Sequence, residues 1–159
     1  PIITQALLLA ADIPVFAGVG GGLTKGQRVV NLAMFAEMQG ATGVVVNAPT
    51  ANTVVQHVAE TIDIPVVVTV ARADTDFEAR LQAGANIFNV SAAAETPAIV
   101  RSIRERYPDV PIIATGGPTD ESILETIQAG ANAITWTPPS NGEIFRDIMA
   151  AYRENKPHP

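Results

Sequence analysis

The chain is built from two short sequence patterns that alternate along its length. Three segments enter an apolar run through Asp-x-Pro, and they read DIPVFAGVG (12–20), DIPVVVTVA (63–71) and DVPIIATGG (109–117). Three others enter one through Gly-Ala, and they read GATGVVVNAP (40–49), GANIFNVSA (84–92) and GANAITWTP (130–138). Because copies of each pattern recur about every 45 to 50 residues, one repeating unit holds a pair of predicted strands with their connections.

The apolar runs are continuous instead of alternating with polar residues, which is typical of parallel strands that are covered on both faces. Between them the apolar spacing becomes helical. The predicted helical faces are Val54, Val55, Val58, Ala59 and Ile62; Ile99, Val100, Ile103 and Tyr107; and Ile144, Phe145, Ile148, Met149 and Tyr152. The sequence therefore predicts alternating strands and helices.

Local signals mark where these helices begin and end. Thr96-Pro97 places a proline at a helix start, and Ser140 with Glu143 has the spacing of a capping box. The glycines of the three Gly-Ala patterns fall where helices should stop, because glycine tolerates a left-handed backbone. We expect an opening helix at Ile3–Ala11 and then six strand–helix units, all within one domain, 1–159.

Paired strand–helix units of this kind are the quarters of a (β/α)8 barrel, and three of the four quarters are visible. We therefore predict an α/β fold with a barrel-type parallel sheet of six βα units, a partial TIM barrel that lacks the first two strands. Six strands alone would close too tightly. An open doubly wound parallel sheet is the alternative.

Composition narrows the classes of partner. Apolar residues make up 47% of the chain, and its net charge is −6 without a basic cluster, so we expect no nucleic acid and no membrane surface as partners. The chain has no cysteine, its apolar runs are too short to span a bilayer, and no cluster of His, Asp and Glu has metal-ligand spacing. We expect a cytoplasmic protein that needs no metal and no cofactor.

The glycine-rich stretch GVGGGLTKGQR (18–28) matches neither nucleotide pattern: the P-loop requires Gly-Lys-Ser/Thr, and the dinucleotide motif requires G-x-G-x-x-G. It follows the first predicted strand. Its glycines and Lys25 would suit a lid over a bound anion, and a long surface connection explains the stretch equally well.

The stretch PIIATGGPTDESILETIQAGANAITWTPPSNGEIF (111–145) resembles the phosphate-gripping end of the phosphate-binding TIM-barrel superfamily. The ATGG run followed by AGANAI is also similar to ketodeoxyphosphogluconate-type aldolases and N-acetylmannosamine-phosphate epimerases. The resemblance implies that the visible strands are the third to eighth of a barrel and that Gly116, Gly117, Thr137 and Ser140 contact a phosphate. The alternative is that the glycines only make a turn and Ser140 only caps a helix.

Catalytic candidates come from the ends of the strands, where barrel enzymes carry them. The predicted set is Arg72, Glu95 and Lys25, with Asn47 and Asn89 orienting the substrate. Arg72 would clamp a carboxylate or phosphate, or it would pair with a nearby Asp on the surface. Glu95 would transfer a proton or begin a helix. No strand carries the lysine that Schiff-base aldolases use.

Together these features predict a protein that binds a small phosphorylated molecule, as a lyase or isomerase acting on a sugar or keto-acid phosphate. The alternative is a non-catalytic ligand-binding regulator or scaffold, because the strand ends carry few ionisable groups. We also expect a homo-oligomer, since a sheet that is not closed leaves two edges.

Overall fold

The computed structural model describes residues 2–136 and 140–154. In chain order its elements are α1 (Ile2–Ala10), β1 (Phe16–Gly20), α2 (Gln27–Met38), β2 (Gly43–Val46), α3 (Asn52–Ala59), β3 (Val66–Val70), α4 (Phe77–Gln82), β4 (Ile87–Val90), the 3-10 turn η1 (Ala93–Glu95), α5 (Thr96–Arg106), β5 (Ile112–Thr115), α6 (Asp120–Gln128), β6 (Ala133–Thr135) and α7 (Asn141–Arg153).

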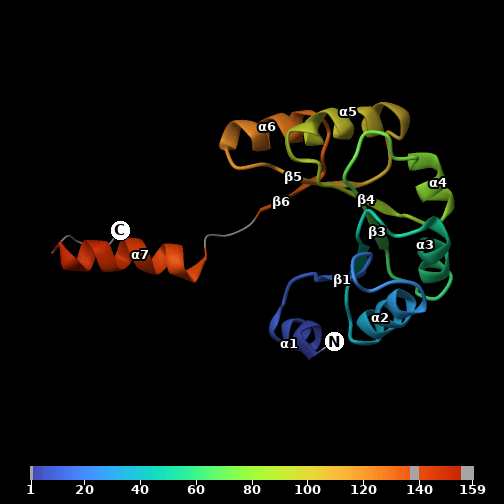
Figure 1. Cartoon of the computed structure of the whole chain (residues 1–159), viewed down its shortest axis with the longest axis horizontal. Helices are drawn as coiled ribbons and strands as arrows, with labels where there is room; N and C mark the ends of the chain where they lie inside the picture. The colour runs from blue at the N-terminus through green and yellow to red at the C-terminus, as the bar shows by residue number, and fades with distance from the viewer. Residues whose placement is uncertain (1, 137–139, 155–159) are drawn as a thin grey trace.

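All strands belong to one six-stranded sheet in the order β1-β2-β3-β4-β5-β6, and every neighbouring pair is parallel. The sheet curls, and helices α2 to α6 lie along its outer side (Figure 1). A doubly wound sheet would instead reverse its strand order and carry helices on both faces. The partial barrel is therefore confirmed, and the open doubly wound alternative is wrong.

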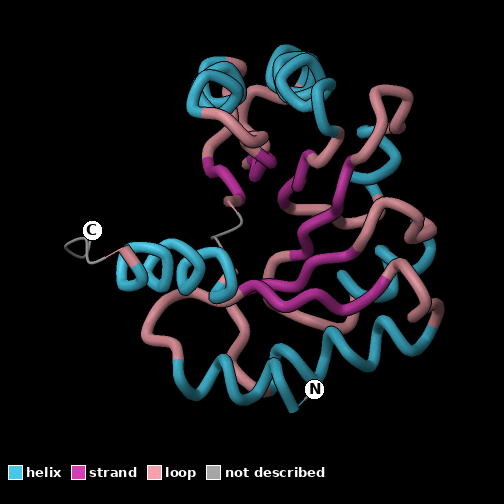
Figure 2. Tube along the Cα trace, turned by 60° about the vertical axis from the view of Figure 1, so that its left-hand side comes forward, coloured by secondary structure: helices cyan, strands magenta, loops and turns pink. Residues whose placement is uncertain are grey.

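The hydrophobic core lies between the convex face of the sheet and these helices, which the trace shows as an outer layer (Figure 2). Val66, Val68 and Val70 of β3 point into it, together with Val55 and Val58 of α3. Side chains alternate along a strand, so Val67 and Thr69 project from the opposite, concave face. Each continuous apolar run thus contributes side chains both to the core and to the concave face of the sheet.

The two repeated sequence patterns bond to one another at the start of each strand pair. Asn86, third residue of Gly-Ala-Asn, accepts through Oδ1 from Val66 N at 2.8 Å, and its own N–H donates to Val66 O at 2.9 Å. Asn132 makes the same pair of bonds with Ile112, at 2.9 and 2.8 Å.

We call this reciprocal pair of hydrogen bonds the clasp. The first unit forms it with Thr42, whose Oγ1 accepts from Val15 N at 3.2 Å and whose N–H donates to Val15 O at 2.8 Å. In each unit the clasped residue directly follows the proline of Asp-x-Pro. Proline lacks an N–H and fixes its own φ, so the next residue is the first that can pair. Each copy of the sequence repeat therefore aligns the starts of two neighbouring strands through the same two hydrogen bonds.

The predicted helix ends are confirmed. Gly40, Gly84 and Gly130 follow α2, α4 and α6 with φ of 91°, 98° and 109°, a region that favours glycine. Thr96-Pro97 begins α5, and Ser140 with Glu143 forms a capping box on α7. The opening helix is also confirmed, one residue earlier than expected.

The outer edges of β1 and β6 are open among the described residues. Large apolar side chains are exposed near both ends of the sheet: Ile2, Ile3, Leu7, Leu9 and Phe16 at the β1 end, and Leu124, Ile127 and Trp136 at the β6 end. Helix α7 extends away from the sheet (Figure 1), and Phe145, Met149 and Tyr152 of its expected apolar face are exposed. Within the described ranges, no helix is long and apolar enough to cross a membrane.

We predict that Asn86→Ala lowers the free energy of unfolding by about 1 to 3 kcal/mol, because it leaves the N–H of Val66, which is 1% exposed, without its side-chain partner. Thr42→Val should cost less, because the Thr42–Val15 bond is exposed. Chemical denaturation measures both, with the surface variant Asn31→Ala as control. Equal stability of Asn86→Ala and Asn31→Ala would contradict the role of the clasp.

Candidate functional site

A row of polar side chains crosses the concave face of the sheet near the carboxyl ends of its strands. Thr69 of β3 is in register with Asn89 of β4, and Thr115 of β5 is in register with Thr135 of β6. Asn89 is half-buried and lies opposite Ile113, so the row runs along neighbouring strands of one face. Below Thr69 and Asn89 the face is apolar, with Val45, Val67 and Ile87 in register with one another.

Hydrogen bonds join the members of this polar row in pairs. Asn89 Nδ2 donates to Thr69 Oγ1 at 3.3 Å, and Thr135 Oγ1 donates to Thr115 Oγ1 at 3.3 Å. The other amide atom, Asn89 Oδ1, is buried and has no hydrogen-bond partner among the described residues. Because a buried acceptor without a donor is unfavourable, Asn89 is suited to receive a ligand hydroxyl.

The Gly116–Gly117 turn follows β5 at the same edge. A Cβ on Gly116 would lie 2.7 Å from Ile123 Cγ1 and 2.8 Å from Ile134 Cγ2, and Gly117 has φ of 80°. Glycine is therefore required by packing at the first position and by backbone conformation at the second. The turn borders a cavity of about 350 Å³ that Thr115, Ser122 and Glu125 also line.

Ser140, the other described residue of the expected phosphate site, is engaged with Glu143. Glu143 Oε2 accepts from Ser140 N and from Ser140 Oγ, both at 2.7 Å. These hydrogen bonds lower the pKa of the Glu143 carboxyl, first through the serine side chain and then through its backbone. The N–H and the hydroxyl of Ser140 thus already bind a carboxylate. Thr137 lies outside the described residues.

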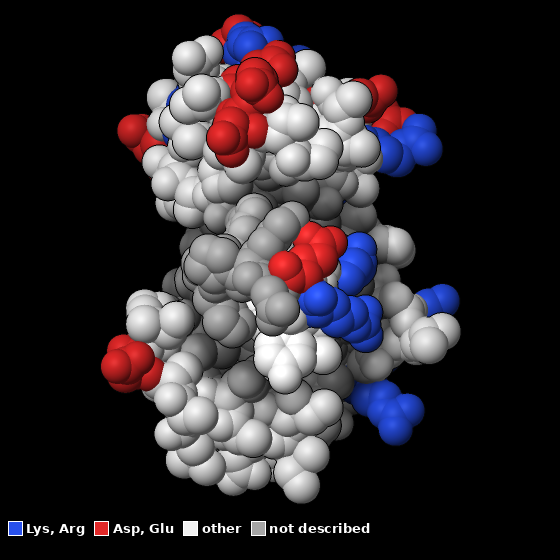
Figure 3. Space-filling model, turned by 90° about the vertical axis from the view of Figure 1, so that its left-hand side faces the viewer, with Lys and Arg blue, Asp and Glu red and all other residues white. Residues whose placement is uncertain are grey.

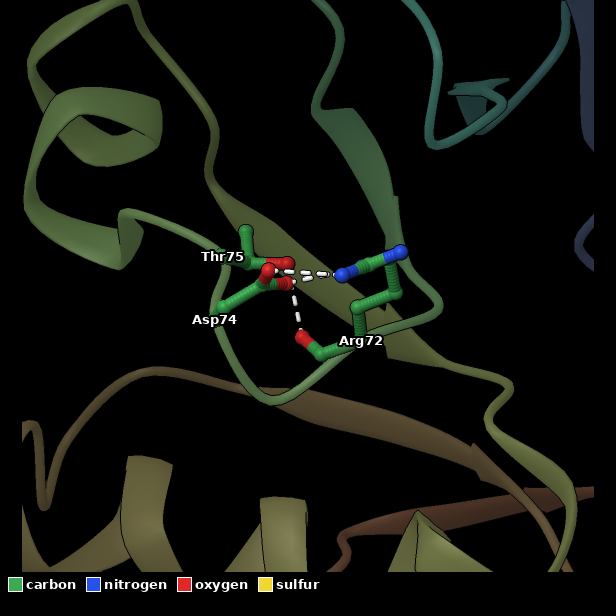
Figure 4. A network of polar contacts seen from close by, with 3 residues as sticks. All are labelled: Arg72, Asp74 and Thr75. Carbon is green, nitrogen blue, oxygen red and sulfur yellow. Dashed lines mark hydrogen bonds and ion pairs between the residues drawn. The ribbon is translucent and has the colours of Figure 1, made fainter.

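Arg72 follows β3 and forms an exposed ion pair with Asp74 (Figure 4). Its Nε donates to Asp74 Oδ1 at 2.9 Å and its NH2 to Asp74 Oδ2 at 2.8 Å. Hydrogen bonding with Asp74 raises the pKa of Arg72, with a smaller contribution from the charge of Glu95, and the same contact lowers the pKa of Asp74. The structure therefore brings Arg72, Asp74 and Glu95 to one part of the carboxyl edge.

Lys25 and Asn47 lie at the other end of this edge, after β1 and β2. The backbone of Asn47 bonds to both neighbouring loops: its N–H donates to Gly20 O at 2.9 Å, and its carbonyl accepts from Thr50 N at 3.0 Å. Lys25 lines a cavity of about 250 Å³ beside Thr50. The sheet order places these residues several strands away from the Gly116–Gly117 turn.

Charges are unevenly distributed over the molecule. Acidic side chains gather over the end that carries α6 (Figure 3), and Asp120 and Glu121 occupy the first turn of that helix. Hydrogen bonds to the backbone and to Thr119 lower the pKa of Glu121. In the described ranges, no group of three or more His, Asp or Glu is placed to hold a metal ion.

The sequence prediction missed three members of the polar row, Thr69, Thr115 and Thr135. A signal for them existed, because Val67-x-Thr69, Ile87-x-Asn89 and Ile113-x-Thr115 share an apolar-then-polar alternation. It also missed Thr50, which is 5% exposed with an unpartnered Oγ1. Nothing in the sequence separates Thr50 from an ordinary loop threonine.

No family model matches the chain. No curated protein matches it either. Solved structures do resemble it in fold: a phosphonopyruvate hydrolase crystallised with oxalate and Mg²⁺ is 14% identical with a TM-score of 0.73, covering 98% of this chain and 66% of that one.

A phosphoenolpyruvate phosphomutase from Streptomyces platensis subsp. rosaceus is 17% identical with a TM-score of 0.69, over 97% of this chain and 67% of that one. An aldolase is 19% identical with a TM-score of 0.71, over 97% and 81%. The chain spans 59% of the length of a dihydrodipicolinate synthetase-type protein of similar fold from Pseudomonas aeruginosa, and 81% of that of the aldolase. At these identities the likeness establishes a TIM-barrel type of fold.

Proposed function

We propose that the chain binds a small phosphorylated keto acid or sugar on the concave face of its sheet and acts on it as a lyase or isomerase. The observation that carries this proposal is the unpartnered Oδ1 of Asn89 within a row of hydroxyl groups, at the carboxyl edge of a barrel-type sheet. Barrel enzymes place their active sites at this edge. The solved proteins of similar fold, a hydrolase, a mutase and an aldolase among them, support the same class of chemistry.

In this proposal the row Thr69, Asn89, Thr115 and Thr135 orients the hydroxyl and carbonyl groups of the substrate. Asn89 Oδ1 accepts from a substrate hydroxyl, and the threonine hydroxyls donate to or accept from neighbouring oxygens. The apolar residues beneath the row keep water from that side of the ligand. Asn47 orients the substrate from the end of β2.

The phosphoryl group is assigned to the Gly116–Gly117 turn, with Thr137 and Ser140 as further proposed contacts. Glycines allow backbone N–H groups to approach an anion closely, and the start of a helix favours negative charge. The N–H and hydroxyl of Ser140 already hold the Glu143 carboxylate at 2.7 Å, so a phosphate would exchange with this carboxylate.

The proposed catalytic set is Arg72, Glu95 and Lys25. Arg72 is bidentate to Asp74 and can exchange this carboxylate for that of a keto acid in the same geometry. Glu95, at the end of η1, is exposed, and its charge is the smallest of the contributions to the raised pKa of Arg72; in this proposal it exchanges a proton with the substrate. Lys25 neutralises substrate charge from the glycine-rich loop.

A non-catalytic ligand-binding protein is the second candidate. Its supporting observation is that the polar row contains threonine and asparagine only, without a side chain that transfers protons near neutral pH. Two assays on a phosphorylated keto acid distinguish the candidates: pyruvate release, measured with a coupled dehydrogenase, reports a lyase, and conversion of the substrate to an isomer, followed by NMR, reports an isomerase. Turnover in either assay supports the enzyme, and binding without turnover in both supports the ligand-binding protein.

We predict that Asn89→Leu weakens binding of 2-keto-3-deoxy-6-phosphogluconate by about five- to tenfold, because one neutral hydrogen bond is lost. Thr115→Val, which keeps the side-chain shape, should act in the same direction. Isothermal titration measures both, with Asn31→Ala on the surface of α2 as the matched control. If neither variant binds more weakly than the control, the ligand does not sit on the concave face.

We also propose that the chain associates with itself through its open sheet edges and the apolar side chains beside them. Trp136, which is 65% exposed, directly follows β6 and is the only tryptophan of the sequence. Association that covers this edge should shift its fluorescence to shorter wavelength as the protein concentration rises, in parallel with the sedimentation coefficient. A fluorescence maximum and a sedimentation coefficient that are both independent of concentration would contradict this proposal.

A further inference from the structure

We infer that the glycine-rich loop Gly20–Gly26 covers a phosphate-binding site of its own, in the cavity between the starts of α2 and α3. This site follows β1 and β2, whereas the Gly116–Gly117 turn follows β5, so the inference goes beyond the proposed function. Lys25 belongs to both proposals, and Thr50 and the starts of α2 and α3 belong to this one alone. The ligand it would take is a phosphate ion or the phosphate monoester of a small molecule.

The cavity has a volume of about 250 Å³. Two loops and two helices build its wall, with Gly21, Thr24 and Lys25 from the first loop, Thr50 and Ala51 from the second, Val29 from α2 and Val54 from α3. Gly21 N donates to Thr24 O at 3.0 Å within the first loop, and Asn47 N, at the start of the second loop, donates to Gly20 O at 2.9 Å. The cavity is therefore a formed feature of the carboxyl edge.

Two helix starts border this cavity without a side-chain cap. The N-cap of α2 is Gly26 and that of α3 is Ala51, neither caps its helix through a side chain, and neither helix has an acidic residue in its first turn. Asp76, Thr119 and Ser140 cap α4, α6 and α7 through their side chains, and each of these helices has an acidic residue in its first turn, whereas α5 also lacks a side-chain cap. Two uncapped helix starts leave N–H donors and favourable dipoles for an anion.

Thr50 provides the independent indication of a ligand. Its side chain is 5% exposed, it lines the cavity, and its Oγ1 has no hydrogen-bond partner in the described part of the chain. A Cβ on Gly21 would lie 2.2 Å from this Oγ1, and Gly21 has φ of 99°. Only glycine can therefore lie against the hydroxyl, and a phosphate oxygen would supply the acceptor that it lacks.

Arg80 of α4 holds the second loop in place. Its NH2 donates to Ala48 O at 2.8 Å, and its NH1 donates to the carbonyl of Thr50 and, at 2.8 Å, to Asn52 Oδ1. Partial burial lowers the pKa of Arg80, yet its guanidinium stays charged and donates to these three oxygens. Arg80 is thus a positioning residue for Thr50 and for the start of α3.

Lys25 supplies the positive charge that a phosphate requires. It is exposed, and it makes no ion pair with any of the described residues. On a chain of net charge −6, an unpaired lysine beside two uncapped helix starts forms a local site that attracts small anions. The two helix starts, the lysine and the buried hydroxyl together offer hydrogen-bond donors from several directions, which suits the oxygens of a tetrahedral dianion.

The test is titration of the whole chain with inorganic phosphate, followed by amide chemical shifts and calorimetry. Lys25→Ala should weaken phosphate binding by about tenfold, because a charge-assisted contact is lost, and Thr50→Val by about fivefold. Arg101→Ala, which removes an exposed arginine on α5, is the matched control and should bind like the unchanged chain. Amide shifts are expected at the starts of α2 and α3.

Equal affinity in Lys25→Ala, Thr50→Val and Arg101→Ala, or no phosphate binding to the unchanged chain, would overturn the inference. Equal binding of acetate would also overturn it, because the site would then not select phosphate. Thr50→Val keeps the side-chain shape, and its melting temperature shows whether the fold is retained. Asn89→Leu should leave phosphate shifts at α2 and α3 unchanged, so failure of the concave-face proposal is distinguishable from failure of this one.

Discussion

The reciprocal clasp between the third residue of each Gly-Ala pattern and the residue after each Asp-x-Pro proline organises this fold. Asn86 with Val66, Asn132 with Ile112 and Thr42 with Val15 each join the start of one strand to the start of the next through two hydrogen bonds. A parallel sheet has no tight turn to set its register, and here a side chain aligns the starts of the pairs β1–β2, β3–β4 and β5–β6. Since register fixes which residues face the helices, the core and the concave face both depend on this contact.

The clasp also explains why polar side chains gather at one edge. With the starts aligned, residues at equal distance along neighbouring strands fall in one row, and Thr69 meets Asn89 just as Thr115 meets Thr135. The same alignment brings the loops after β1 and β2 together, where Gly21 lies against Thr50. Both proposed binding sites thus depend on strand register.

The fold could be predicted from the sequence because its signals are local and repeated. Continuous apolar runs, helical spacing between them and glycines such as Gly84 at helix ends each reflect a requirement of the backbone. The site was harder to predict, because it depends on contacts between distant segments. Ser140 was recognised as part of a capping box, but the geometry of its contact with Glu143 emerges only in the structure. Thr50 became notable only through its burial without a partner.

The central claim is that ligands of this chain bind at the carboxyl edge of its sheet. A crystal structure of the chain grown with 2-keto-3-deoxy-6-phosphogluconate tests it most directly. The account predicts ligand density on the concave face, with a hydroxyl within hydrogen-bond distance of Asn89 Oδ1 and Thr115 Oγ1 beside it. Density confined to the amino ends of the strands or to the outer surface of the helices would contradict it.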